Sequence, residues 1–587
     1  MKLRIPPSRS LGAVVVVLVG ILLFAGSIPT SVREPKRNAA LVEVVGKVTE
    51  DGGNVVLGSS RLCDSFDPSV SFDAWCAVVF RLYSRNLMSF SNQSGDASFE
   101  VQPDLAESAP KVSASRMYWT FSLRKNARWN NGEYLTAEDV RYSIERLYSP
   151  AVLGAVNYKY LCLLSDCPKG VPSYKGPGKK GDNHLSAIRL SGKNTITFRL
   201  TSPNPDFARV LALPQFAIIS KQRDLYLKEA KKSYSALPSS SGPFVFKRDK
   251  TTKAVSFTRN KYWIQASDAI RQPHVDSFTW KVIPSVTALN QATLVGDIDI
   301  RLGEDLTLSD VGARNQLTRF SSRVDQPFTG FTSFLAVRPM TGPLDRTSCR
   351  QAIFYAVNKK ALAEIKGGDQ KAQIANSMLA PNIAGFDSGN DLLGSADHPE
   401  GDLAAADAAL KKCGYPEGFE VTMAYLNVGI GSQIFKSIQS SLARVGIVVA
   451  PKKYDNYSKF ISITRSTEEL NNENISLIVS GVQSQVNSPL DFWSGIADGR
   501  LIKPFDNENL ALLDSTKIND ALDNLIAESS RAATLSAEIN DEVMSRAVYL
   551  PYAYDRIVLY RNPAIVGIYV QQALGSQYDL VNVGLSR

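Results

Sequence analysis

The sequence predicts an α/β protein built from several lobes, and three observations carry that prediction. A chain of 587 residues is too long for one hydrophobic core, since single cores stop growing at roughly 250–300 residues. With 44% apolar and 21% charged residues, the composition is that of an ordinary folded protein, neither disordered nor polytopic in a membrane. Strand-like and helix-like patterns are mixed along the chain without a repeat, which is typical of α/β lobes.

The stretch from Trp119 to Leu147 shows both patterns clearly. Tyr118–Leu123 alternates large apolar and polar side chains, as a half-buried strand does. Residues 130–132, Asn-Asn-Gly, predict a turn. Thr136 then caps a helix, and Asp139 stands where a capping box requires a carboxylate. The apolar residues of this helix share one face: Val140, Ile144 and Leu147.

Other elements follow the same two patterns. The predicted strand-like segments are 54–58, 195–200, 241–246 and 255–260, of which the last two form a hairpin. The predicted helical stretches are 349–362 and 404–412, and Gly414 follows the second at the C-cap position.

The N-terminus predicts export. Basic residues at positions 2, 4 and 9 precede an apolar run over 11–26. At ~1.5 Å per residue this run spans about 24 Å, short of a ~30 Å hydrocarbon core. Residues 1–27 are therefore interpreted as an export signal or an N-terminal membrane anchor, and 28–50 as a polar linker. A lipid anchor is not expected, because Ser27 occupies the place of the lipid-bearing cysteine.

The six cysteines predict disulfides in an oxidising compartment. Six cysteines allow fifteen pairings, which sequence alone does not resolve. Short loops favour the local pairs Cys63–Cys76 and Cys162–Cys167, which leaves Cys349–Cys413 by elimination. A zinc site is disfavoured, since the spacings match no zinc template and the chain has three histidines.

Two broad classes of function are disfavoured. The net charge of +9 is spread over the whole chain, with no basic, aromatic-studded motif for nucleic acid. The three histidines are far apart in sequence, and neither a nucleophile elbow nor a phosphate-binding loop is present. The adjacent carboxylates Glu138 and Asp139 are explained by helix capping and the helix dipole. We therefore expect a protein that is not an enzyme, with no catalytic residue, no metal and no cofactor.

The motifs along the chain resemble those of a known family. Segments 123–132 and 135–140, Leu-Arg-Lys-Asn-Ala-Arg-Trp-Asn-Asn-Gly and Leu-Thr-Ala-Glu-Asp-Val, resemble the signature of family 5 extracellular solute-binding proteins. These are the oligopeptide, dipeptide and nickel receptors of ABC importers. Further segments match in the same order: Ser241–Phe244, Arg259–Trp263, Gly296–Asp299, Arg350–Ile353 with Tyr355–Val357, and Cys413–Phe419.

The resemblance implies a two-lobed periplasmic-binding-protein-like fold with an additional domain and a ligand cleft between the lobes. Lobe I is discontinuous in this family, and we assign it residues 51–90, 236–330 and a C-terminal return at 546–587. The additional domain is expected over 91–235 and lobe II over 331–545. Closure of such a cleft excludes water from the bound solute.

The ligand residues are inferred from the same resemblance. Peptide-binding members carry a Trp-x-x-Asp-Tyr-x-x-Pro-like segment, whose carboxylate grips the amino terminus of the peptide. Here Val482 stands for the Trp and Gln485 for the Asp, and a neutral amide cannot neutralise an ammonium. We expect the cleft to be lined by Gly481, Val482, Gln483 and Gln485, with Asp491 as a substitute carboxylate if the loop runs differently. From the other lobe we expect Asp64 and Phe66, although Asp64 and Asp67 could instead shape a loop before Pro68.

The resemblance and the export signal together predict a monomeric receptor outside the cytoplasm, at the cell surface or in the periplasm. It would deliver a peptide or peptide-like solute to ABC permease subunits in the membrane. Two alternatives remain: a receptor for another small solute, such as a sugar, an opine-like compound or a chelated metal, or a surface signalling or interaction protein on the same scaffold.

Overall fold

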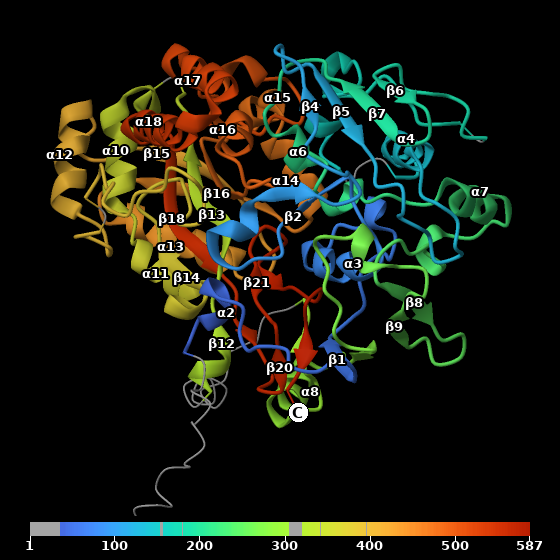
Figure 1. The fold of residues 1–587 in the computed structure, drawn as a ribbon. Coiled ribbons are helices and arrows are strands. Elements are labelled where there is room, and N and C mark those ends of the chain that lie inside the picture. Colours follow the sequence, from blue (N-terminus) through green and yellow to red (C-terminus); the bar gives the residue numbers. More distant parts are fainter. Residues whose placement is uncertain are drawn as a thin grey trace, which may run out of the picture.

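The computed structural model describes residues 36–152, 156–178, 180–303, 320–340, 342–394 and 396–586. The predicted export segment lies outside these residues. Three larger β-sheets organise the chain, and the buried apolar residues form two large, separate cores. Figure 1 shows the six-stranded sheet and its helices on one side, and the other two sheets on the opposite side. The predicted α/β, multi-lobed fold is confirmed.

The five-stranded sheet belongs to lobe I and has the order β11-β1-β10-β9-β8. Strand β1 runs parallel to both of its neighbours, while β9 is antiparallel to β10 and β8. Its strands are β1 Asn54–Ser59, β8 Phe244–Arg248, β9 Val255–Arg259, β10 Ser277–Val282 and β11 Ile300–Arg301. Strand β1 was predicted from its apolar side chains, and Val55 and Leu57 are fully buried. The predicted hairpin is β8–β9.

The four-stranded antiparallel sheet, order β4-β5-β7-β6, lies within residues 91–235, the predicted additional domain. Its strands are β4 Lys111–Val112, β5 Tyr118–Ser122, β6 Ile188–Ser191 and β7 Thr195–Arg199. The predicted helix after β5 is α4, Ala137–Arg146. Its capping box is present, and the backbone N–H of Thr136 donates to Asp139 Oδ2 over 3.1 Å. This domain shares one core with the five-stranded sheet.

The six-stranded mixed sheet belongs to lobe II and has the order β14-β18-β13-β17-β15-β16. Its two antiparallel central strands are β13 and β17, and β15 runs parallel to both β16 and β17. The strands are β13 Phe328–Val337, β14 Ala372–Ile374, β15 Glu420–Leu426, β16 Val448–Tyr454, β17 Leu477–Val482 and β18 Tyr549–Arg556. The second core forms around this sheet.

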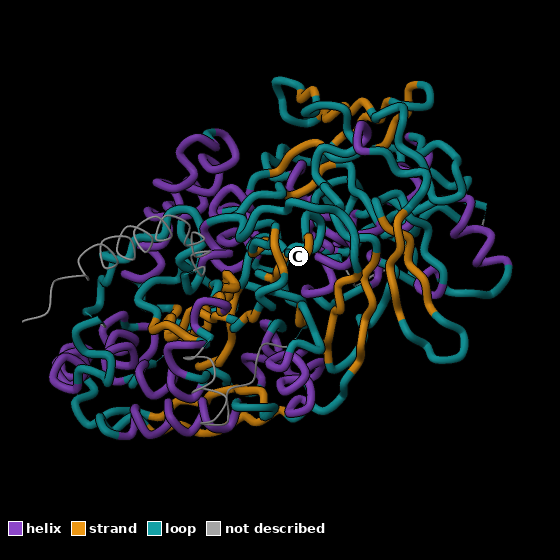
Figure 2. Tube along the Cα trace, turned by 60° about the horizontal axis from the view of Figure 1, so that its bottom comes forward, coloured by secondary structure: helices purple, strands orange, loops and turns teal. Residues whose placement is uncertain are grey.

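Helices cover lobe II more densely than the other parts, as Figure 2 shows. The lobe II helices are α10 Thr347–Ala356, α11 Lys359–Ile365, α12 Leu403–Cys413, α13 Gly431–Ala443, α14 Tyr457–Thr464, α15 Thr467–Asn472, α16 Pro489–Ala497, α17 Thr516–Ala527 and α18 Ala532–Ser545. Elsewhere lie α2 Ala39–Val42, α3 Ala77–Tyr83, α5 Tyr158–Leu161, α6 Phe207–Val210, α7 Lys221–Glu229 and α8 Val286–Val295. In the described part of the chain, no helix is both long and apolar enough to cross a membrane.

One predicted helical stretch is divided. The periodicity over 349–362 is interrupted after α10, because Val357 adopts an extended conformation. Asn358 then caps α11, accepting the N–H of Ala361 over 2.8 Å. A side-chain cap of this kind restarts a helix within an apolar pattern that continues across the break.

Two segments link the lobes side by side. Strand β12, Val324–Asp325, pairs with β19, Leu559–Tyr560, next to the pairing of β13 with β18. The chain therefore leaves lobe I before β13 and returns after β18. This corrects the predicted return at 546, because β18 lies inside the lobe II sheet. The remaining domain boundaries stay predictions.

The C-terminal segment packs against the start of the chain. Its strands are short: β20 Ile565–Val566, β21 Val570–Gln571, β22 Gln577–Tyr578 and β23 Gly584–Leu585. Val45 forms a bridge with Ile568, and Val570, Leu580 and Val583 are buried in the first core. The first core therefore contains residues from both ends of the described chain.

All three predicted cysteine pairs are disulfides in the structure. Cys63–Cys76 and Cys162–Cys167 close short loops, with sequence separations of 13 and 5. Cys349–Cys413 spans 64 residues and joins the start of α10 to the end of α12.

Candidate functional site

The first of two adjoining cavities lies between the lobes. This interlobe cavity has a volume of about 260 Å³. One wall includes Phe72 and Ala77 of lobe I. The opposite wall includes Thr329, Gln483 and Gln485 of lobe II. A solute held here would contact both lobes at once.

The second cavity lies on lobe II and has a volume of about 430 Å³, which is within the usual range for small-molecule sites. It is lined by the ends of β13, β15 and β17 and by the starts of α13 and α14. Lys159, from α5 of the additional domain, also lines it. Gln483 and Gln485 line both cavities, so the two are adjacent.

Four of the residues predicted to bind the ligand lie together at these cavities. Gly481, Val482, Gln483 and Gln485 all line the lobe II cavity. Gly481 and Val482 are the last residues of β17, and Gln483 and Gln485 lie in the turn that follows it between the lobes. Gln483 Nε2 donates to the backbone oxygen of Thr329 over 2.7 Å, which fixes one side of the turn. Ligand contact by these residues stays a prediction.

Asp491 is placed behind the cavity wall, and its carboxylate is fully engaged. Lys159 Nζ lies 2.7 Å from Oδ1, and the Tyr160 hydroxyl donates to the same oxygen over 2.7 Å. The Ser484 hydroxyl and the Gln485 N–H donate to Oδ2 over 2.8 and 2.9 Å. Burial raises the pKa of Asp491, but the Lys159 ammonium and these hydrogen bonds outweigh it and hold the pKa below its ordinary value.

This ionic contact belongs to a larger attachment between lobe II and the additional domain. Val486 is fully buried in the first core, although its neighbours in sequence belong to lobe II. The Ser488 hydroxyl donates to Asp206, and Asn157 Nδ2 donates to Glu508 Oε1 over 3.3 Å. The segment 483–491 therefore lines the cavities and holds two parts of the protein together.

The lobe I residues that were predicted to face the cleft contact other parts of lobe I and the additional domain instead. The ring of Phe66 is 2% exposed and packs 4.6 Å from the ring of Phe246, so it supports the core of lobe I. Asp64 accepts hydrogen bonds from the N–H groups of Ser65 and Phe72, each over 2.8 Å. Asp67 is buried against Arg146. Both carboxylates shape the loop, which was the alternative interpretation.

The sequence reasoning missed the aromatic lining of the lobe II cavity. Phe331, Tyr425, Tyr457, Phe460 and Tyr552 all line it. In the sequence they look like ordinary core residues of strands and helices. Tyr425, Phe460 and Tyr552 are in fact buried in the second core and reach the cavity from it, whereas Tyr457 is 63% exposed. Which core residues border a cavity cannot be read from periodicity.

A glycine makes room for one of these rings. A Cβ at position 481 would lie 2.1 Å from Phe331 Cζ. We expect Gly481→Ala to turn the Phe331 ring into the lobe II cavity and to weaken the binding of a solute there about tenfold, a cost of about 1.4 kcal/mol. Calorimetric titration with the solute that the wild type binds measures this, and Gly389→Ala on an exposed loop is the control. Unchanged affinity would show that no ligand reaches Phe331.

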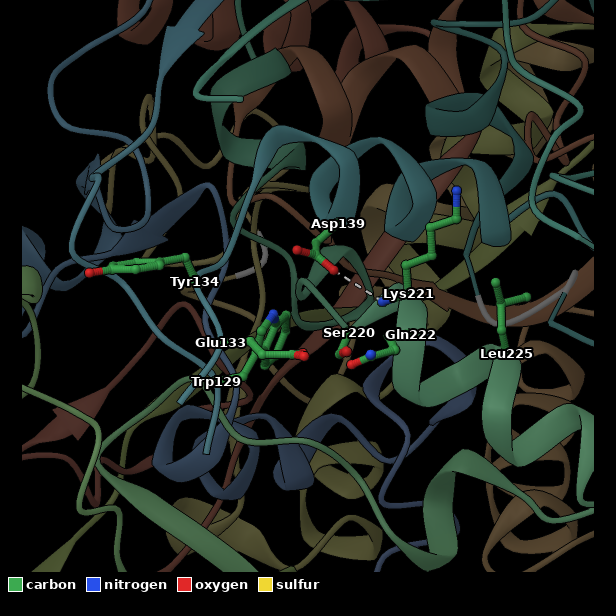
Figure 3. A pocket seen from close by; sticks show the side chains of 8 residues that line it. All are labelled: Trp129, Glu133, Tyr134, Asp139, Ser220, Lys221, Gln222 and Leu225. Carbon is green, nitrogen blue, oxygen red and sulfur yellow. Dashed lines mark hydrogen bonds between the residues drawn. The ribbon is translucent and has the colours of Figure 1, made fainter. Parts of the chain in front are cut away.

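A third cavity, in the additional domain, has a structural explanation. It has a volume of about 330 Å³ and is lined by the residues drawn in Figure 3. Asp139 Oδ1 accepts the N–H of Lys221 over 3.1 Å, and Ser220 caps α7. Trp129 is 2% exposed. The polar groups here are occupied in joining α4 to α7, so the Trp119–Leu147 stretch is scaffold.

The described residues contain no group of three or more His, Cys, Asp or Glu side chains placed to hold a metal ion. Two lobes with separate cores, joined by paired strands around a cavity that both line, define a binding protein of the two-lobed, cleft type.

Comparisons with known proteins give the family. Residues 100–500 match "Bacterial extracellular solute-binding proteins, family 5 Middle", and the chain belongs to this family. It is 25% identical to heme-binding protein A of Haemophilus influenzae over 538 residues, covering 88% of this chain and 89% of that protein. It is 27% identical to di/tripeptide-binding protein 1 of Pseudomonas aeruginosa over 402 residues, covering 66% and 67%.

A solved structure agrees with this assignment. The clavulanic acid biosynthesis oligopeptide binding protein 2 is 29% identical, with a TM-score of 0.84, and the match covers 94% of this chain and 99% of that one. The predicted family and the two-lobed fold are confirmed.

Proposed function

We propose that this protein is an extracytoplasmic receptor that captures a peptide or peptide-like solute and delivers it to an ABC importer. The observation that carries the proposal is the interlobe cavity, whose walls come from two separately cored lobes. Lobe movement about the paired β12–β13 and β18–β19 segments would open and close it. A closed receptor differs in shape from an empty one, which gives a permease a way to distinguish them.

The peptide assignment is supported by relatives. Di/tripeptide-binding protein 1 and a dipeptide-binding protein of Escherichia coli are similar to this chain in sequence. We assign solute contact to Gly481, Val482, Gln483 and Gln485. The relatives are binding proteins, and no catalytic role is proposed. We also propose that the protein is a monomer exported through residues 1–27, which either are removed or remain as an anchor.

A thermal-shift screen of purified protein tests this function. A ligand present at 100 times its Kd stabilises the folded state by about 2.7 kcal/mol, which corresponds to about 2 °C in Tm for a chain of this size. We expect a shift of that order with a peptide library. If peptides produce no shift while a sugar, an opine-like compound, a chelated metal or heme does, the protein is a receptor for that solute instead.

A further inference from the structure

The interlobe cavity is neutral. None of the described side chains that line it is charged. Its polar groups are a hydroxyl from Thr329, another from Ser484, and six side-chain amides: Gln215, Asn382, Gln483, Gln485, Asn487 and Gln572. Amides offer donors and acceptors to a neutral polar solute, but they supply no counter-charge.

Some of this hydrogen-bonding capacity is unused. Asn382 Oδ1 is buried and has no partner among the described residues. Gln485 uses its backbone N–H to bind Asp491, and its exposed side chain lines both cavities. The exposed Gln485 amide is therefore placed to meet a polar group of the solute.

The lobe II cavity is lined by more cations than anions. Its charged lining consists of Lys159, Lys366, Arg465 and Glu508. Glu508, the one carboxylate in this described lining, lies 3.3 Å from Arg465 and accepts a hydrogen bond from Asn157. It is therefore already neutralised. Lys159 and Lys366 pair with Asp491 and Asp555 outside the lining.

Apolar groups are exposed at the same cavity. Val428 and Tyr457 are 57% and 63% exposed, and both line it beside Ile430. Large apolar side chains left open to water around a cavity are typical of a site that receives an apolar group. An apolar side chain of the solute fits here.

A peptide with a free amino terminus would bring an ammonium group into this site. Desolvating an ammonium group without an available carboxylate is unfavourable. The carboxylates next to the lobe II cavity, Asp491, Asp555 and Glu508, are already paired with cations of this protein. We therefore propose that the solute is a peptide whose amino end is uncharged, as in an N-acylated or cyclic peptide, and which carries an apolar side chain. This inference rests on the proposed function as a peptide receptor.

The test compares two libraries of tri- to pentapeptides that differ only in N-acetylation. In calorimetric titration we expect the acetylated library to bind at least about tenfold more tightly, corresponding to about 1.4 kcal/mol. If the free-amino library binds equally or more tightly, the inference is wrong and the peptide-receptor function stands. If neither library binds but another solute class does, the proposed function fails and the inference fails with it.

A charge substitution provides an independent measurement. Gln485→Asp places a carboxylate at the junction of the two cavities on an exposed side chain, so the fold is not at risk. We expect it to improve the affinity for free-amino peptides about tenfold relative to their acetylated partners. The matched control is Gln291→Asp, on exposed α8 and outside both cavities, which leaves the preference unchanged. If Gln485→Asp leaves the preference between free-amino and acetylated peptides unchanged, the amino end does not lie beside residue 485.

Discussion

Replacing Asp491 with alanine is expected to lower the free energy of unfolding by about 3 kcal/mol. The substitution leaves the Lys159 ammonium and the Tyr160 hydroxyl without their acceptor, and it removes the acceptor of Ser484 and of the Gln485 N–H. The loss lies at the lower end of the range for breaking a buried ion pair, because the Lys159 side chain is 32% exposed and can be hydrated.

Denaturant unfolding followed by tryptophan fluorescence measures this change. Asp520→Ala, on the exposed face of α17, is the control and should remain within about 0.5 kcal/mol of the wild type. Lys159→Met together with Asp491→Ala should cost less than the sum of the single substitutions, because the pair is removed together. Strict additivity would show that the two groups do not stabilise each other.

The same contact predicts a pH dependence. Since the pKa of Asp491 is lowered in the folded state, its contribution to stability is present above the unfolded-state pKa and is lost as the pH falls through the folded-state pKa. The difference in unfolding free energy between the wild type and Asp491→Asn should therefore be constant above about pH 5 and shrink below about pH 4. A difference that instead shrank toward pH 8 would contradict the ionised carboxylate.

The second large effect is expected for the disulfide between Cys349 and Cys413. Their sequence separation of 64 means that the bond restricts a long loop in the unfolded chain. Replacing both cysteines with alanine should cost about 4 kcal/mol. The measurement is denaturant unfolding without reductant, with the transition of lobe II followed by hydrogen exchange.

The control replaces the pair Cys162 and Cys167, whose separation is 5. The shorter loop predicts a smaller cost of about 2 kcal/mol. If the short-loop variant lost as much stability as the long-loop variant, restriction of the unfolded chain would not be the source of the effect.

The sequence predicted those helices and strands whose formation depends on residues close to one another in the chain. The alternation of β5, the capping box of α4 and the C-cap glycine of α12 each depend on residues close in sequence, and each is present. The division between α10 and α11 was missed, because the same apolar face continues through both helices while Asn358 supplies a new cap.

The site depends on contacts that are distant in sequence, so much less of it was predictable. Phe66 lies in the core of lobe I because the rings of Phe246 and Trp280 pack against it at tilted and edge-on angles. Asp491 was considered as a ligand for an ammonium group, but Lys159 supplies that group from another domain. The resemblance in sequence pointed to Gly481 and Gln485, and both line the lobe II cavity.

The first core contains residues from both ends of the described chain, and this has a consequence for biosynthesis. Strand β1 is made early, but its partner β10 and the covering residues Val570, Leu580 and Val583 are made much later. A polypeptide that is still being synthesised or translocated therefore cannot complete lobe I, and its apolar strands stay exposed until release. Lobe II can complete its six-stranded sheet once β18 has been made. Truncation near the C-terminus should consequently yield a product with one finished lobe and one that proteases can digest.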